Sequence, residues 1–175
     1  LTSVVLWAFA AACLLVVSPL LYVVAGAVDY KPLGGAVSSA AGQYWLILAG
    51  LMLVIVGLLF KVAAVPFHAW SPDVYQGAPT PVTGFMAAGV KAAACLALVR
   101  FYYLIAGAMG WDLAPALWAV AALTMLLGTV VGVVQRDVKR MLAYSAIAHA
   151  GFMLIGIGAY SKAAISALSF YALTY

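Results

Sequence analysis

Charged residues are scarce in this chain, and glutamate is absent altogether. Only 7% of the 175 residues are charged, whereas 69% are hydrophobic. A soluble domain usually carries about 25% charged residues. A domain of this length also leaves roughly 30% of its unfolded surface exposed to water, so no soluble fold has enough interior to hide this much apolar surface. We therefore expect lipid to be the solvent for most of the chain.

The same scarcity excludes several kinds of site. All four aspartates lie in short links or at the ends of apolar stretches, and no serine or cysteine stands beside a base as a nucleophile would. The two histidines are too few and too far apart to predict a metal site. Cys13 and Cys95 lie in apolar runs that predict neither a disulfide nor a cluster. There is no glycine-rich nucleotide loop, and the scattered basic residues disfavour nucleic-acid binding.

What the chain has instead is long apolar stretches. About 20 apolar residues cross a bilayer as a helix, which satisfies its own backbone polar groups. We predict an all-α integral membrane protein, with a single transmembrane domain over 1–175 that forms a polytopic bundle of about five to six helices. Because the chain begins with Leu1 and is still apolar at Tyr175, we expect a fragment of a longer protein. The predicted helices lie at about 4–26, 44–70, 80–106, 113–134, 141–160 and 163–175.

A lysine and a proline stand inside the second of these stretches, in FKVAAVPFHAW at residues 60–70. Pro66 lacks a backbone N–H and clashes with the carbonyl of Val62, so we predict that the helix breaks near 62–66, just after Lys61. Interrupted helices at mid-depth in transporters free backbone groups that line cavities and hold ions or water. The alternative is a lysine at the end of a proline-terminated helix, followed by interfacial aromatic residues.

Lys91 is predicted to lie deepest in the membrane. It follows Thr80 by eleven residues, which is about 16 Å along a helix and close to the middle of a ~30 Å core. A lysine there costs roughly 2.5–3.5 kcal/mol on insertion scales. Snorkelling suits Arg100, near the end of the same stretch, but the interface is too far from Lys91 for its side chain to reach. We therefore favour a functional role, since intramembrane lysines usually face a bundle interior or a wet cavity.

Two histidines add to this set. His149 is also near mid-depth, although a buried histidine can serve structure alone, and His68 lies closer to the surface and is the weaker candidate. Desolvation disfavours the charged form of a deep lysine, whereas a nearby carboxylate favours it. Such an amine can exchange its proton near neutral pH when its surroundings change. We interpret Lys61, Lys91 and His149, with His68 as a weaker member, as a proton relay.

Residues 60–94 carry a resemblance to a known family. The run FKVAAVPFHAWSPDVYQGAPTPVTGFMAAGVKAA resembles the antiporter-like membrane subunits of proton-pumping NADH:quinone oxidoreductase (respiratory complex I). It shares FK, PFH.W.PDVY.GAPTPV and a second lysine thirty residues after the first. KRMLAYSAIAHAGFML, at 139–154, resembles a later helix of the same subunits. The segment DVYQGAP is more similar to subunit N than to subunits L and M, and a looser likeness extends over the whole chain.

The resemblance implies a fold of two inverted repeats of five helices, each with one interrupted helix. Lys61 matches the lysine on the first interrupted helix, Lys91 the bridging lysine on the next helix, and His149 the histidine of the later helix. The family also has a glutamate on an earlier helix, which pairs with the first lysine, and a further lysine on a later interrupted helix. Neither has a counterpart in this sequence.

The resemblance also implies a function, that of a non-redox subunit of a translocase that conducts protons and contributes to pumping. It implies no cofactor on this chain, because NADH, FMN, iron–sulfur clusters and quinone belong to other subunits. The implied partners are other membrane subunits and the lipid bilayer, with no nucleic acid. We expect an integral, multi-pass protein of a bacterial cell (inner) membrane, with the QRDVKR link on the cytoplasmic side.

Two other classes are retained as alternatives. The first is a subunit of a multi-subunit cation/proton antiporter or the membrane arm of a hydrogenase, which the segment PDVYQGAPTPV disfavours. The second is a structural membrane scaffold, which predicts that Lys61 and Lys91 tolerate replacement by methionine or leucine.

Overall fold

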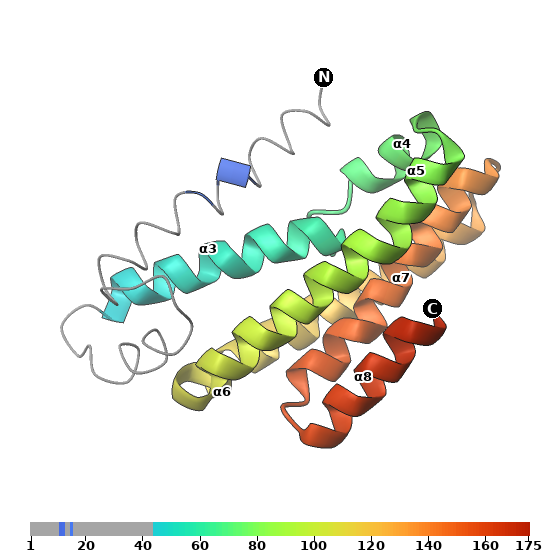
Figure 1. Cartoon of the computed structure of the whole chain (residues 1–175). Helices are drawn as coiled ribbons and strands as arrows, with labels where there is room; N and C mark the ends of the chain where they lie inside the picture. Colours follow the sequence, from blue (N-terminus) through green and yellow to red (C-terminus); the bar gives the residue numbers. More distant parts are fainter. Residues whose placement is uncertain (1–10, 13–14, 16–43) are drawn as a thin grey trace.

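The computed structural model describes residues 11–12, 15 and 44–175 of the chain (Figure 1). The helix predicted at about 4–26 lies almost entirely outside these residues. Within 44–175 every regular element is a helix and there is no strand, so the prediction of an all-α membrane protein is confirmed for this part. The elements are α3 (Tyr44–Val62), α4 (Trp70–Gly77), α5 (Thr80–Phe85), the π-helix η1 (Met86–Val90), α6 (Lys91–Val133), α7 (Val138–Gly158) and α8 (Lys162–Thr174).

Three helical spans in the described residues are long and apolar enough to cross a membrane: Thr80–Tyr103, Leu113–Val133 and Val138–Gly158. The first of them runs through α5, η1 and the start of α6. Helix α6 then turns back, as Figure 1 shows at its lower end. Leu98 and Leu117 line one cavity, although a straight helix would separate them by roughly 28 Å. Helix α6 therefore supplies parts of two spans that lie against each other.

The second half of α6 packs closely against α7. A Cβ atom added to Gly128 would lie 2.6 Å from the backbone nitrogen of Ala148, and one added to Gly151 would lie 2.9 Å from the backbone oxygen of Ala121. The residue number falls along α6, from 128 to 121, as it rises along α7, from 148 to 151, so the two helices are antiparallel. Small residues allow this approach, which matters because helices in lipid associate through packing and hydrogen bonds.

Two clusters of buried side chains hold the described helices together. The larger lies between α3, both halves of α6, and α7, and includes Leu59, Leu98, Leu117, Met153 and Ile157. The smaller joins the end of α3 to α4 and α7, and consists of Phe60, Ala63, Trp70, Tyr75, Ala143, Ala146 and Ile147. The smaller cluster fixes α4 against the first half of α7. It therefore determines the orientation of the residues that follow the helix break.

The segment SPDVYQGAPTP folds differently from the sequence-based expectation. The sequence predicts a polar link between two helices here, but most of the segment forms α4 and the start of α5. Trp70, Ser71 and Tyr75 are buried on one face of α4, whereas Asp73 and Gln76 are exposed on the other. In so short a segment, the proline, glycine and charged residues obscure the helical spacing of the buried residues, so the sequence alone does not predict a helix. The predicted link AMGWD likewise falls inside α6.

The close contact between α6 and α7 predicts the effect of a single added methyl group. Gly128→Ala should lower the free energy of unfolding by about 1–3 kcal/mol, because the methyl group meets the α7 backbone, which cannot move aside cheaply. Thermal unfolding of the purified protein in detergent measures this. Gly84→Ala is the matched control, since a Cβ atom there meets nothing within 4 Å and alanine favours the helix. Equal melting temperatures for the two variants would contradict the packing described here.

Candidate functional site

Helix α3 ends at Val62 in a Schellman motif. The Ala63 N–H donates to the Phe60 carbonyl at 3.0 Å, and the Ala64 N–H donates to the Leu59 carbonyl at 2.9 Å. Ala63 adopts a left-handed φ of 63° at the position where helices most often have glycine. The motif satisfies two of the carbonyl groups that the break frees, so α3 stops without exposed acceptors at these positions.

Long-range hydrogen bonds satisfy further polar groups at the break. The Val65 N–H donates to the hydroxyl of Thr124, on the second half of α6, at 3.0 Å. The Trp70 indole N–H donates to the Phe60 carbonyl at 3.0 Å. An unpaired backbone group costs several kcal/mol in hydrocarbon. These bonds therefore explain how the interruption predicted near Pro66, and confirmed by the ends of α3 and α4, is stable at this place.

Lys61 and His68 lie on opposite sides of the break. Lys61 is half-buried in the last turn of α3, beside Phe60, a member of the smaller buried cluster. His68 is half-buried in the connection to α4, and its Nδ1 atom is buried with no hydrogen-bond partner in the described part of the chain. The break thus brings Lys61 to the edge of the cluster that contains α4, and the roles of both residues in a relay stay predictions.

Lys91 is buried inside the bundle, with only 2% of it exposed. It follows directly after η1, and π-helical turns frequently occur at functional sites. Its Nζ atom has no hydrogen-bond partner among residues 44–175. That atom lies 5.9 Å from the centre of the Tyr75 ring, within the range of a cation–π contact. The amine therefore points at α4 and away from lipid.

Tyr75 and Ser71 are the site residues that sequence reasoning missed. Both are buried on α4, with 2% and 0% exposed, and neither hydroxyl has a hydrogen-bond partner in the described part of the chain. Burial raises the pKa of Tyr75 to about 12, so the phenol keeps its proton. Their spacing of four residues, at the two ends of SPDVY, is the signal that indicates a shared helical face.

A cavity of about 350 Å³ lies between α4, α5, η1 and α7. Its lining includes Tyr75, Thr83, Ala87, Lys139, Ser145 and Ala146. Ala87 is one helical turn before Lys91, so the cavity reaches close to the buried amine. Lys139 lies near the start of α7, at the QRDVKR end of the bundle, and its Nζ atom donates to the Ala78 carbonyl at 3.1 Å. The cavity therefore extends from that end toward the interior, and residues with hydroxyl groups form part of its mainly apolar lining.

His149 is half-buried on α7 and contacts α8. Its Nδ1 atom and the Tyr171 hydroxyl form a hydrogen bond, and its ring centre lies 4.5 Å from that of Tyr175. Of the residues predicted from sequence, Lys61 and His68 flank the helix break, while Lys91 and His149 lie on α6 and α7, which pack against each other.

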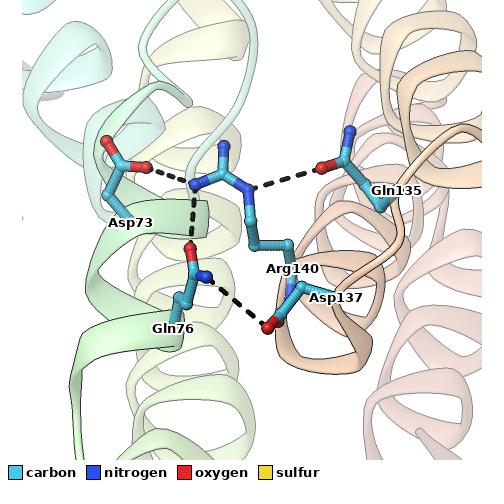
Figure 2. Close-up of polar contacts among 5 residues, drawn as sticks. All are labelled: Asp73, Gln76, Gln135, Asp137 and Arg140. Carbon is cyan, nitrogen blue, oxygen red and sulfur yellow. Dashed lines mark hydrogen bonds and ion pairs between the residues drawn. The ribbon is translucent and has the colours of Figure 1, made fainter.

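A polar network around Arg140 ties α4 to the start of α7 (Figure 2). The Arg140 guanidinium donates to Asp73 at 2.7 Å, to Gln76 at 3.1 Å and to Gln135 at 3.3 Å. Asp137 caps α7 by accepting the Arg140 backbone N–H at 3.0 Å, and Gln76 donates to its second oxygen at 3.5 Å. An exposed ion pair alone contributes only about 0–1 kcal/mol. Here the Arg140 guanidinium joins the segment that contains α4 to the QRDVKR link. Its main effect is therefore to orient α4.

The side chains gathered at this site include several that can take up or release a proton. The described residues contain no group of three His, Cys, Asp or Glu side chains that could hold a metal ion. What they present is a buried amine, an imidazole, neutral hydroxyls and a cavity, beside an interrupted membrane helix. The fold and site therefore define a class: a helical, multi-span membrane protein with one interrupted helix, a feature that recurs in transporters.

Comparison with known proteins identifies the family. The family model described as NADH:quinone oxidoreductase/Mrp antiporter, TM matches residues 1–175, and the chain belongs to this family. It is 55% identical to NADH-quinone oxidoreductase subunit N of Beutenbergia cavernae over 170 residues, which make up 97% of this chain and 32% of that protein. The resemblance to antiporter-like membrane subunits is therefore confirmed. The chain spans about a third of the length of the curated relatives it matches.

Two solved structures show the same fold. Respiratory complex I from Thermus thermophilus with bound aureothin contains a chain 42% identical to this one, with a TM-score of 0.77 over 98% of this chain and 35% of that chain. The membrane-bound sulfane sulfur reductase, an archaeal respiratory membrane complex, contains a chain 32% identical, with a TM-score of 0.86 over 97% and 35% of the two chains. The fold is thus shared by respiratory complexes of different chemistry.

The hydrogen bond between Thr124 and the helix break can be tested by removing one hydroxyl. Thr124→Val should destabilise the protein by about 1–3 kcal/mol, because the Val65 N–H then has no acceptor in a buried site. Thr124→Ser keeps the acceptor and should recover most of the loss. Thermal unfolding in detergent measures both variants, with the exposed Thr129 changed to valine on the same helix as the control. If Thr124→Val melted like Thr129→Val, the role assigned to this hydroxyl would be wrong.

Proposed function

We propose that this chain is part of an N-type membrane subunit of a proton-pumping NADH:quinone oxidoreductase. In this proposal Lys61, Lys91 and His149 carry protons, and His68 assists at the helix break. NADH, FMN, iron–sulfur clusters and quinone are bound by other subunits, and the partners of this chain are other membrane subunits of the same complex. The support comes from the family, from relatives named subunit N, and from the site itself.

The observation that carries the proposal is the environment of Lys91. Its amine is buried, faces a tyrosine ring and has no hydrogen-bond partner in the described part of the chain. An unpaired buried ammonium is costly, and replacing such a charge with an apolar residue often stabilises a protein. A lysine retained in this setting beside a cavity is better explained by proton exchange than by stability.

One alternative is supported by a specific observation. The family description covers Mrp antiporters as well as the oxidoreductase, and a chain of a sulfane sulfur reductase has the same fold. Each of these is a membrane complex with its own chemistry. Purification of the complete complex in mild detergent separates them, because an NADH:quinone oxidoreductase brings flavin and iron–sulfur clusters with it, whereas a cation/proton antiporter brings neither.

The relay predicts the outcome of two lysine substitutions. Lys61→Ala and Lys91→Ala should each lose most of the NADH-driven proton pumping, because each removes a group that must take up and release a proton, while the complex still assembles. Pumping is measured by fluorescence quenching in inverted membrane vesicles, and assembly by the amount of intact complex in the same membranes. Lys162→Ala, on an exposed lysine at the start of α8, is the matched control.

Replacement by methionine separates the relay from a structural scaffold. Lys91→Met keeps the length and apolar stem of the side chain but cannot hold a proton. A scaffold predicts that this variant pumps normally and melts at the same or a higher temperature. The relay predicts the same or a higher melting temperature together with lost pumping, so normal pumping in Lys91→Met would count against it.

A further inference from the structure

Four buried side-chain polar atoms have no hydrogen-bond partner among the described residues: His68 Nδ1, Ser71 Oγ, the Tyr75 hydroxyl and Lys91 Nζ. Native proteins rarely leave such atoms unpaired, and each one requires an explanation. Three of the four gather at one place, since Ser71 and Tyr75 share a face of α4 and Lys91 Nζ faces the Tyr75 ring at 5.9 Å. Together they provide the two to four polar partners that a buried water needs.

Tyr75 lies between Lys91 and the cavity. It lines the cavity of about 350 Å³ together with Thr83, Lys139 and Ser145, and its ring faces Lys91. The cavity is wide enough for several waters, and although most of its lining is apolar, the hydroxyl groups of Thr83 and Ser145 can hold some of them. Tyr75 thus lies between the cavity and Lys91, so a proton that moved from the cavity toward the lysine would pass this side chain.

We propose that Tyr75, assisted by Ser71 through ordered water, passes protons between this cavity and Lys91. The inference rests on the proposed function and adds a direct proton-carrying residue to it. A protonated water in the cavity gives its proton to the Tyr75 oxygen as that oxygen releases its own proton, through water at Ser71, to the neutral amine of Lys91. One O–H bond forms at Tyr75 and one breaks, so the phenol is neutral before and after, and the charge moves from water to Lys91.

The Arg140 network explains how Tyr75 is kept in this position. Asp73 and Gln76, on the exposed face of α4, are both held by Arg140 of α7. Tyr75 lies between them in sequence and points to the opposite, buried face. Any rotation of α4 that withdrew the hydroxyl from Lys91 would break these contacts, so the network and the buried cluster fix the same orientation.

The test removes single hydroxyls from the complete subunit in its assembled complex. Tyr75→Phe should lose most of the proton pumping in inverted vesicles while the complex assembles normally. Tyr102→Phe, at a tyrosine of α6 that is equally buried but about 16 Å along the helix from Lys91, should pump like the wild type. Ser71→Ala should lower pumping and Ser71→Thr should retain it, a contrast that packing alone does not predict.

The outcomes separate this inference from the function on which it rests. If Lys91→Ala loses pumping but Tyr75→Phe does not, Tyr75 is not the carrier, whereas the lysine relay stands. If neither loses pumping, both proposals fail. Should Tyr75→Phe not assemble, a high-resolution map of the wild-type complex decides: water density within hydrogen-bond distance of both the Tyr75 hydroxyl and Ser71 Oγ supports the inference, and a dry, directly packed site overturns it.

Discussion

The helix break between α3 and α4 is the feature on which the rest of this structure depends. A membrane helix can be interrupted only if its freed backbone groups find partners within the protein. Here the partners come from the Schellman motif at Ala63, the Thr124 hydroxyl and the Trp70 indole. With these bonds made, the chain can leave the axis of α3 and place α4 inside the bundle. Without them Tyr75 would not face Lys91.

The two most distinctive segments of the sequence, PDVYQGAPTPV and QRDVKR, are in contact with one another (Figure 2). Arg140 reaches across to Asp73 and Gln76, and Lys139 donates to the Ala78 carbonyl. The helix break and the helix that carries His149 are therefore connected at one end of the bundle. We infer that the charged residues of these links orient the interrupted helix, since their individual contributions to stability are small.

Much of the fold could be predicted from the sequence, and much of the site could not. Composition and the lengths of the apolar stretches predict a helical membrane protein, and Pro66 predicts the break within a few residues. The left-handed Ala63 has no such signal, because glycine is the usual residue there. Thr124 and Tyr75 matter through contacts with distant segments, and a single sequence does not reveal which segments meet. The π-helix before Lys91 likewise has no simple residue pattern.

Lys91 and His149 lie on α6 and α7, which pack against each other, so the proposed relay can couple the two charges. A positive charge on one of them disfavours a positive charge on the other when both lie in a region of low dielectric. In the proposed relay, the cavity lined by Tyr75 would supply protons to Lys91 from one end, while His149 is hydrogen-bonded to Tyr171 on α8. A proton arriving at Lys91 would then help to release one held at the half-buried His149, so the proposed relay would conduct by repulsion between its two sites.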